Sequence, residues 1–576
     1  MKKELIKTSI EELDDDFDKY LFIADWCLKS KTINSENLEV IEYPFKANQI
    51  KEIYEEINNV TESLLVDLTN TYNRHFEINE NKKYYKIIIG RWLFHFVSNV
   101  FEKIILVNNA IDLYPNISTK TSDFNYELSS DSNSYYQKSY SDDLFNQKLF
   151  SSIINLKNNI NKTNVDLSKA KKGKKFKTSF FAKIKKSIKP LLGRILVKIN
   201  KILFDDFILV VDPYYTRKYI FNSIWFFLKS KGKIIHYEFT KNESNNDLDY
   251  STRKELGSFN YENSSELLNI SSIILFKFIP TCYLESFYDL REKSKEWHSK
   301  HQKCKGFFTA NSIHTNEFFK YIVAFNPNNS LSIVQHGNGY GTFRLISAEE
   351  YERSVADKYY TWGWGDLKLP HPKLSLNKET NYKSRSRIVF TFPSVTNYSG
   401  LLETIHLYFI EKQNIIEDSN KVLKGLLPEI KESLVKRELK QDNLITMQLN
   451  YRLKEDKIKD FHISLYKSKI HLTNHFGTPF LESISMNIPT VLFLSNFKDY
   501  LRDEVIDIFL ELKDANIIFD NPKLASTHIN KYYDSIDDWW LKDSTQQIIT
   551  KFKSKFCISD SNWKNIWLKE LITKNK

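Results

Sequence analysis

Short apolar runs alternate with longer stretches of helical periodicity along most of the chain. Apolar residues that recur every three or four positions predict helices, and short runs rich in β-branched residues predict buried strands. The first series of expected strands is Leu21–Asp25, Asp206–Val211, Lys233–Tyr237, Gly306–Ala310, Leu331–Gln335 and Tyr359–Trp362. The expected helices of this part are Ile50–Leu68, Tyr84–Val107, Arg217–Ser230, Leu267–Phe278, Leu284–His301, Ile313–Ala324 and Glu349–Ala356. Such alternation is typical of a parallel sheet.

A second alternating series follows the polar stretch Leu367–Ser386, which we interpret as a linker. Its expected strands are Arg387–Phe392, Leu444–Leu449, Lys469–Leu472 and Thr490–Leu494, and its expected helices are Leu401–Ile410, Pro428–Leu439 and Phe480–Met486. The pattern predicts an α/β fold with two Rossmann-like parallel-sheet domains, residues 1–375 and 386–576, that face a cleft. Because ligands of open α/β sheets bind at the carboxyl ends of strands, residues that directly follow a strand are the first site candidates.

Residues 118–205 interrupt the first domain. Ser118 to about Asn164 is rich in Ser, Asn, Asp and Tyr without a sustained period, which favours a long surface insertion. The segment Lys169–Lys201 then holds twelve Lys and one Arg with no acid. Apolar residues interleave with these lysines at near-helical spacing, although Pro190 and Gly193 are expected to interrupt any single long helix.

The charge excess belongs to this one basic segment. The chain carries 83 Lys and Arg against 72 Asp and Glu, a balance of +11, so the chain outside the +13 segment is near neutral. A nucleic-acid-binding protein would show a basic face across the fold, and we therefore expect no nucleic-acid partner. A local basic and partly apolar stretch is suited to binding an anionic membrane surface. The alternative is a segment that extends from the surface into solvent and binds nothing.

Length and composition limit the class of protein further. The 576 residues include 41% hydrophobic residues, which is an ordinary globular profile. No run of about 18 apolar residues predicts a spanning helix. The N-terminal lysines are not followed by the apolar core of a secretory signal. The four cysteines, Cys27, Cys282, Cys304 and Cys557, show no paired spacing, which suits a reducing cytoplasm.

A glycine-rich loop directly follows the predicted strand Leu331–Gln335. It reads Gln335-His336-Gly337-Asn338-Gly339-Tyr340-Gly341, and its glycines permit positive φ and a close approach of a ligand to the backbone. The successive amides could form an anion-binding nest, and His336 is placed as a general base. A tight turn with a hydrogen-bonded histidine is the alternative. The spacing is not that of a dinucleotide-binding fingerprint, and the chain has no P-loop motif.

A polar turn and a helix start follow the predicted strand Lys469–Leu472. Thr473 and Asn474 form the turn, Thr478 stands at the expected N-cap, and Glu482 lies one turn into the helix. Free amides at a helix start suit phosphate, and a carboxylate in the first turn can accept hydrogen bonds from a ribose diol. A capping box with an ordinary acid is the alternative.

Four weaker candidates also follow predicted strands or lie in apolar runs. Arg452, after Leu444–Leu449, could clamp phosphate, and Ser394, after Arg387–Phe392, could contact it. Asp25 could be a catalytic carboxylate, and Arg91-Trp92 could contact an acceptor. A salt bridge or a cap is the alternative for each. His298, His301 and Cys304, and the pair His471 and His475, are poor metal-ligand sets, so no metal site is predicted.

Together these features resemble GT-B glycosyltransferases, and more closely the transferases encoded in bacterial O-antigen and surface-polysaccharide clusters. The matching residues are Thr8–Glu12, Leu21–Cys27, Gly90–Leu93, Gln335–Gly341, Asp357 with Trp362–Trp364, Phe480–Glu482 and Asn487–Thr490. A more distant resemblance is to CDP-glycerol glycerophosphotransferases. Here Gln335 and His336 are adjacent instead of spaced as in those enzymes, and Thr473, Asn474 and Thr478 replace paired serines.

The resemblance implies a glycosyltransferase of bacterial surface-glycan synthesis. It implies a nucleotide-activated sugar donor, with a CMP-linked acidic sugar as one option, and a glycan or lipid-linked glycan acceptor. His336 would be the base, with Asp25 as its rival, and the amides of Gly337, Gly339 and Gly341 would meet the leaving group. Arg452, Thr478, Glu482, Ser394, Thr473 and Asn474 would bind the donor, and Gln335, Arg91 and Trp92 would lie on the acceptor side.

This scheme needs neither a cofactor nor a metal. The enzyme would be cytoplasmic, with the basic segment holding it at the inner face of the plasma membrane. Two alternatives stay open: a polyol-phosphate transferase of the CDP-glycerol type, and a non-catalytic binding protein on the same fold.

Overall fold

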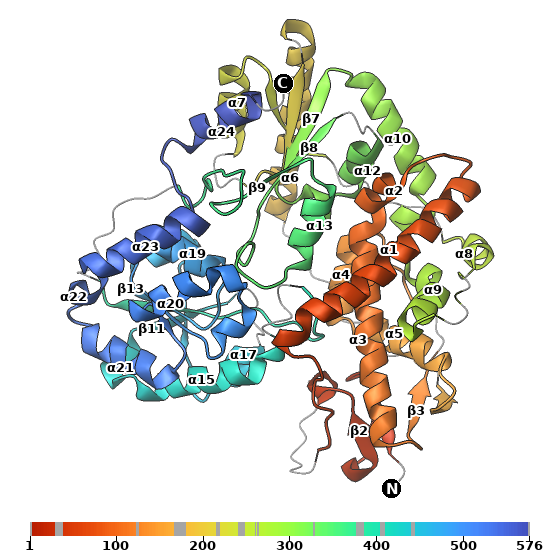
Figure 1. Cartoon of the computed structure of the whole chain (residues 1–576), viewed down its shortest axis with the longest axis horizontal. Helices are drawn as coiled ribbons and strands as arrows, with labels where there is room; N and C mark the ends of the chain where they lie inside the picture. Colours follow the sequence, from red (N-terminus) through yellow and green to blue (C-terminus); the bar gives the residue numbers. More distant parts are fainter. Residues whose placement is uncertain are drawn as a thin grey trace.

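Parallel sheets organise the protein, as the computed structural model shows (Figure 1). It describes residues 3–28, 38–122, 126–165, 180–204, 206–214, 219–239, 248–257, 259, 261, 264–325, 329–375, 385–403, 409–438 and 444–573. Within these residues the strands form a four-stranded, a five-stranded and a six-stranded sheet, and every pairing between their strands is parallel. The α/β fold of Rossmann-like parallel sheets is thus confirmed.

The four-stranded sheet lies near the N-terminus, in the order β2-β1-β3-β4. Its strands are β1 (Glu4–Ile6), β2 (Tyr20–Phe22), β3 (Ser118–Thr121) and β4 (Asn161–Asn164). Between β3 and β4 lie the helices α4 (Ser132–Ser141) and α5 (Asp143–Asn155). Residues 118–164, interpreted above as a long surface insertion, thus contain two helices and contribute two strands to this sheet. The two helices are short and rich in polar residues, so their buried positions, Tyr135 and Leu149 among them, gave no sustained period.

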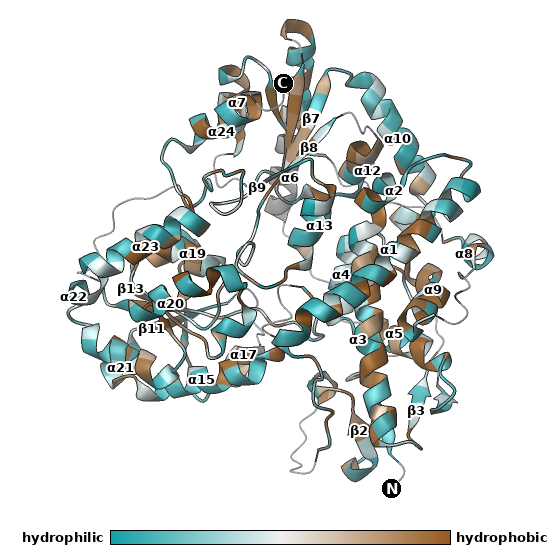
Figure 2. Cartoon of the chain, viewed as in Figure 1, coloured by the Kyte–Doolittle hydropathy of each residue, from teal (hydrophilic) through white to brown (hydrophobic). Residues whose placement is uncertain are grey.

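A helical layer connects this sheet to the next one. It contains α1 (Ile50–His75), α2 (Lys82–Tyr85) and α3 (Arg91–Leu113), with a π-helical turn at Lys86–Gly90 between α2 and α3. The side chains of α3 are buried on most of its circumference, and much of this helix is hydrophobic in Figure 2. Such all-round burial is typical of a core helix.

The five-stranded sheet, here called the middle sheet, has the order β6-β5-β7-β8-β9. Its strands are β5 (Phe207–Val211), β6 (Ile234–Tyr237), β7 (Cys304–Thr309), β8 (Ser330–Val334) and β9 (Lys358–Tyr360). Its helices are α6 (Phe180–Leu203), α7 (Tyr219–Lys229), α8 (Tyr250–Leu256), α9 (Glu266–Phe278), α10 (Phe287–Lys300), α11 (Ser312–Thr315), α12 (Glu317–Phe325) and α13 (Ser347–Val355). The expected interruption at Pro190 and Gly193 is wrong, because α6 continues through both residues and is packed against β6.

The six-stranded sheet has the order β12-β11-β10-β13-β14-β15. Its strands are β10 (Arg387–Thr391), β11 (Leu434–Arg437), β12 (Lys454–Glu455), β13 (Ser468–Thr473), β14 (Thr490–Phe493) and β15 (Ile518–Phe519). The helices of this part and of the tail are α15 (Lys412–Gly425), α16 (Pro428–Glu432), α17 (Leu444–Met447), α18 (Phe461–Tyr466), α19 (Thr478–Ser485), α20 (Ile506–Asp514), α21 (Pro522–Tyr532), α22 (Asp537–Trp540), α23 (Asp543–Phe556) and α24 (Trp563–Thr573). No helix among the described residues combines the length and hydropathy that a membrane crossing requires.

Two predicted elements of this part are wrong. The predicted helix Pro428–Leu439 ends at Glu432, and the residues after it form β11, whose pairing with β10 overrides a weak helical pattern. The predicted strand Leu444–Leu449 is instead the one-turn helix α17. Residues 404–408 of the predicted helix Leu401–Ile410 lie outside the described residues.

The C-terminal helix α24 returns to the middle sheet (Figure 1). Trp567 is buried, its ring lies 5.2 Å from that of Phe308 on β7, and its indole N–H donates to the carbonyl of Pro370. The tail that begins in the six-stranded half therefore ends as part of the hydrophobic core of the other half.

Candidate active site

A cleft of about 1190 Å³ is lined by loops at the carboxyl ends of both larger sheets. From the middle sheet come Tyr214 after β5, His314 in the helix after β7, and His336–Asn338 after β8. From the six-stranded sheet come Phe392–Ser394 after β10, Glu438 after β11, and Gly477, Thr478 and Glu482 after β13. The chain reverses its direction of strand addition between β5 and β7 and between β10 and β13, which is where open parallel sheets bind ligands.

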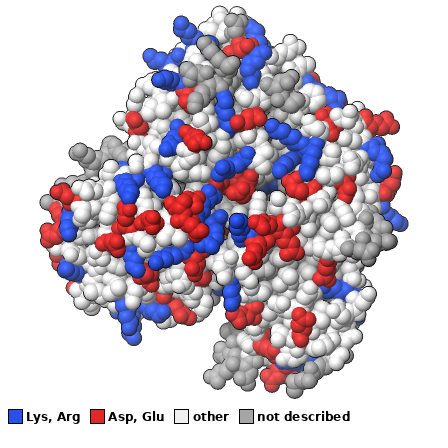
Figure 3. Space-filling view, in the orientation of Figure 1, with Lys and Arg blue, Asp and Glu red and all other residues white. Residues whose placement is uncertain are grey.

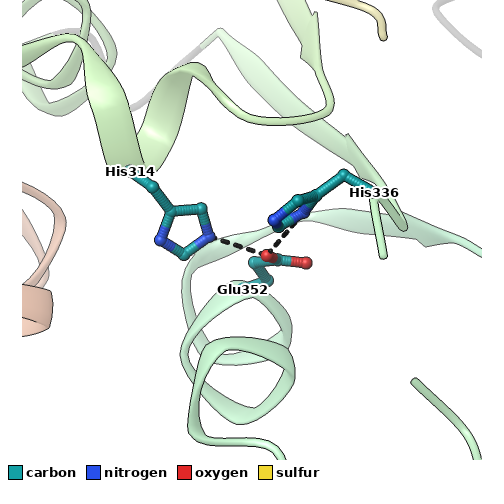
Figure 4. A group of neighbouring side chains, drawn as sticks. All are labelled: His314, His336 and Glu352. Carbon is teal, nitrogen blue, oxygen red and sulfur yellow. Dashed lines mark hydrogen bonds and ion pairs between the residues drawn. The ribbon is translucent and has the colours of Figure 1, made fainter. Parts of the chain in front are cut away.

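A buried carboxylate organises the middle-sheet wall of the cleft (Figure 4). Glu352 comes from α13 and is fully buried. Its Oε1 lies 2.7 Å from His314 Nε2 and 3.2 Å from His336 Nδ1, and both imidazoles line the cleft. Tyr340 donates its hydroxyl to the same oxygen, and Tyr359 donates to Oε2, each at 3.0 Å. Four side chains from three segments, α11, the glycine-rich loop and β9, therefore converge on one carboxylate.

The electrostatics of this cluster favour an ionised carboxylate. Burial alone raises the pKa of Glu352, but His336 and His314 outweigh that effect and lower the pKa to about 2. Burial lowers the pKa of His314 to about 4, so this imidazole is neutral at physiological pH. The cluster thus presents one histidine, His336, beside a permanent negative charge.

The same three residues are the candidate metal ligands of the site. Nitrogen atoms of His314 and His336 and an oxygen of Glu352 lie within 4.8 Å of one another. Two imidazoles and a carboxylate are a donor set that zinc and similar ions accept. In this arrangement, however, the hydrogen bonds of His314 and Tyr340 and the ion pair of His336 with Glu352 Oε1 already account for the convergence.

The rest of the glycine-rich loop serves mainly its own packing. Gly337 lines the cleft, but the amide of Gly341 donates to Glu349 and is not free to bind an anion. Gly339 and Gly341 have φ of +91° and +69°, and a Cβ on Gly341 would lie 2.3 Å from the ring of Trp364. Gln335 is buried, and its amide bonds Gly337, Trp362 and Trp364. The amide nest predicted for Gly337–Gly341 is therefore wrong for Gly341.

Arg91 lines the cleft at the α3 side, as part of a buried ion pair. It makes two contacts of 2.6 Å to Glu403, which follows β10, and one of 3.1 Å to Ser347. Burial raises the pKa of Glu403, but the charge of Arg91 more than offsets this effect, and the net pKa is about 2. Trp92, by contrast, is fully buried and stacks on Phe96, so it belongs to the core.

Asp25 does not take part in the cleft. It lies in a 3₁₀ turn, Asp25–Leu28, and forms an ion pair with Lys412 on α15. The predicted strand Leu21–Asp25 ends earlier, since β2 is Tyr20–Phe22. The alternative of a salt-bridged acid therefore describes Asp25, which is absent from the cleft lining.

Of the six predicted donor-binding residues, three line the cleft and three do not. Thr478 is the first residue of α19, where Gly477 is the N-cap, and Glu482 and Ser394 lie on the same wall. Glu482 is 6% exposed, and burial raises its pKa to about 7 despite Lys373 and Arg437 nearby. The predicted contacts Thr473 and Asn474 are buried and are bonded within the domain, to His475 and to Ser419.

The expected arginine at a strand end is a different residue. Arg452 is exposed in the turn before β12 and does not line the cleft, because the strand predicted before it is the helix α17. Arg437, the last residue of β11, lines the cleft instead. Its guanidinium donates to Asp456 and to the carbonyls of Ile458 and Lys459, which fixes its position.

Sequence reasoning missed His314, Glu352 and Arg437. A signal existed for two of them, since His314 and Arg437 follow or end strands at the same sheet edges as the residues that were predicted. Glu352 lies inside a helix with two glutamates before it, so nothing in its spacing distinguished it from solvated acids.

The chain belongs to the LIC12162 family of transferases, whose family model matches residues 3–571. It is therefore a transferase. No curated protein shows significant similarity to the chain.

Several solved structures share low similarity with this one. The wall teichoic acid polymerase TagF is 12% identical, with 69% of this chain and 98% of that chain covered and a TM-score of 0.33. MurG of Acinetobacter baumannii is 7% identical, with 64% and 99% covered and a TM-score of 0.31. The glycosyltransferase SnogD of Streptomyces nogalater is 8% identical, with 64% and 100% covered and a TM-score of 0.31.

Proposed function

We propose that the cleft transfers a glycosyl group from a nucleotide-activated sugar to a hydroxyl of a glycan or lipid-linked glycan acceptor. The observation that carries this proposal is the composition of the cleft. A histidine paired with a buried carboxylate lines one wall, and a helix start with a buried acid lines the wall contributed by the other sheet. The two walls thus supply a base for an acceptor and contacts for a nucleotide.

In the proposed reaction, His336 removes the proton of the acceptor hydroxyl as its oxygen attacks the anomeric carbon of the donor. The new C–O bond forms while the bond from that carbon to the phosphate oxygen breaks, and the nucleotide leaves with the electron pair. The ionised Glu352 stabilises the imidazolium that forms and fixes the orientation of the ring. His314 and Tyr340 hold Glu352 in place for this role.

The opposite wall supports nucleotide binding. Thr478 and the positive end of the α19 dipole favour a phosphate, and the cations of Lys436 and Arg437 also line the cleft. Glu482, buried on this wall, is an acceptor for ribose hydroxyls. The scheme uses no metal or cofactor step, and CMP-linked acidic sugars are among the donors to be tested.

Nucleotide binding is tested first, by thermal shift with CMP, CDP, UDP, GDP, ADP and NAD. A ligand that binds only the folded protein raises the melting temperature. We expect a shift with a CMP-, CDP-, UDP- or GDP-type ligand that is lost in Glu482→Gln and kept in Glu429→Gln, an exposed acid of the same half. A shift with NAD alone, or equal shifts in both variants, would overturn the donor site proposed here.

The base is tested by kinetics with the donor so identified. We expect His336→Asn to lower kcat by about 10²–10⁴-fold, the usual contribution of a general base. Glu352→Gln keeps the size of the side chain but removes its charge and one of its two acceptor oxygens. It should lower kcat, leave the KM of the donor unchanged and move the acidic limb of the pH–rate profile to lower pH. A merely structural Glu352 would leave that limb unmoved.

Product analysis separates the remaining alternatives. A new glycosidic linkage without phosphorus is the expected product, whereas phosphorus in the linkage would identify a polyol-phosphate transferase. Full activity in His336→Asn would contradict the proposed base. Binding of nucleotide without turnover of any donor would favour a binding protein.

A further inference from the structure

Helix α6 is held against the edge of the middle sheet by one fixed face. Gly193 lies so close to β6 that an added Cβ would be 3.0 Å from the carbonyl oxygen of His236. Leu196 and Val197 are buried on the same side, and the side chain of Asn200 donates to the carbonyl of Gly232. These contacts fix which side of α6 faces the protein, and hence which side faces solvent.

The outward side of α6 is both apolar and basic. Leu191, Ile195 and Ile202 are 57%, 45% and 81% exposed, and they fall within about 40° of one another around a helix. Arg194, Lys198 and Lys201 are exposed along one flank of this stripe. A soluble helix normally buries its apolar stripe and exposes its charges on the opposite side. Here the apolar and basic residues share the exposed side.

Helix α7, which contacts α6, also exposes apolar side chains. Phe221 and Leu228 are 59% and 67% exposed, and Ile220 and Ile224 are also exposed. Residues 220, 224 and 228 are four positions apart and therefore lie near one another along the helix. The ammonium of Lys564, on α24, lies 4.8 Å from the ring centre of Phe221. Neither α6 nor α7 contains an acidic residue.

We propose that the outward sides of α6 and α7, here called the α6–α7 face, bind the surface of an anionic lipid bilayer. Exposed aliphatic and aromatic side chains can enter the boundary between headgroups and acyl chains, while adjacent Lys and Arg meet lipid phosphates. The basic segment that begins at Lys169 leads into α6, and residues 166–179 lie outside the described residues. The proposal does not depend on the proposed function.

Charge argues against the two other kinds of partner. A second copy of the chain docked face to face would place one basic flank against another, which disfavours association. A nucleic acid would find basic side chains but would leave the exposed Ile202 and Phe221 without an apolar partner. On the face of the whole molecule drawn in Figure 3, Lys and Arg side chains of the described residues are mixed with Asp and Glu, and no broad basic field of the kind that a nucleic acid needs is seen there.

The test is co-sedimentation of the full chain with vesicles of phosphatidylglycerol and phosphatidylcholine, compared with phosphatidylcholine alone. We expect binding to the anionic vesicles only. Replacing Arg194, Lys198 and Lys201 together by Gln should weaken it about 100-fold, since each basic residue near an anionic surface contributes about 1 kcal/mol. The matched control replaces the exposed Lys51, Lys424 and Lys542 by Gln, which changes net charge equally and should leave binding unchanged.

A second variant isolates the apolar contribution. Phe221→Ser with Leu228→Ser should weaken vesicle binding about tenfold or more, because two inserted side chains are lost, and the loss should persist at high salt. All these positions are exposed, so the melting temperature of each variant should match that of the unchanged protein. Equal vesicle binding by the basic and control variants would overturn the proposal. So would loss of binding in the presence of RNA, or a dimer that dissociates only in the α6–α7 variants.

Discussion

Glu482 is the residue whose protonation should be visible in the stability of the protein. Burial raises its pKa to about 7, so between about pH 4.5 and pH 7 the folded protein holds a proton that the unfolded chain has lost. The stabilisation linked to this proton is therefore complete below the unfolded pKa and disappears as the pH rises through 7. It amounts to about 3 kcal/mol by the conversion of 1.36 kcal/mol per pKa unit.

We therefore predict that Glu482→Gln flattens the pH dependence of unfolding. Between pH 5 and pH 8, the free energy of unfolding of the unchanged protein should fall relative to that of the variant, measured by denaturant titration without nucleotide. Glu429→Gln, in an exposed position, should follow the unchanged protein. Parallel curves for the unchanged protein and Glu482→Gln would show that the carboxyl is ionised throughout.

At the residue scale, the rule that strands present ligands at their carboxyl ends predicted much of the cleft. It placed His336, Thr478, Glu482 and Ser394 in the lining, where the structure has them. It could not distinguish a side chain that faces the cleft from one that turns inward after the same strand. Thr473 and Asn474 directly end or follow β13 yet are bonded inside the domain.

At the element scale, the strands of the middle sheet could be predicted because they are buried on both faces and read as continuous apolar runs. Phe207–Val211 is buried at every position. The short strand β11 could not be predicted, because only Leu434 of its residues is buried and the segment carries a helical pattern. Because β11 was not predicted, the arginine expected at a strand end was assigned to Arg452, whereas Arg437 has that position.

The ion pair of Arg91 and Glu403 connects α3 to the segment after β10, and we predict that it couples these elements. Arg91→Met leaves Glu403 buried without its main cation, which should cost about 3–5 kcal/mol in the free energy of unfolding. Adding Glu403→Gln to that variant should restore most of the loss. The double-mutant cycle is measured by denaturant unfolding, and additive effects of the two changes would rule out the coupling.

At the scale of the whole molecule, contacts in both directions connect the halves that contain the two larger sheets. The glycine-rich loop of the middle sheet contacts the other half, since Asn338 donates to the carbonyl of Phe476 and the amide of Arg502 donates to that of Thr342. The C-terminal tail leaves the six-stranded half and reaches the middle-sheet half, where α24 contacts α7. The docking site of this tail could not be predicted from the sequence, because Trp567 and Phe308 are far apart along the chain.

We predict that Trp567→Ala destabilises the middle sheet, although the residue follows the six-stranded half in sequence. Removing this buried tryptophan should lower the free energy of unfolding by about 3–5 kcal/mol. The lost contacts are those with Phe308 of β7 and with the carbonyl of Pro370. Limited proteolysis should then cut first in the middle-sheet half, while the exposed Tyr288→Ala control unfolds like the unchanged protein. Cleavage confined to the six-stranded half would mean that α24 does not stabilise the middle sheet. Because His336 and Glu352 stand on the middle-sheet half, a tail that stabilises it also preserves the proposed base, so the same variant should lose donor turnover at a lower temperature than the control.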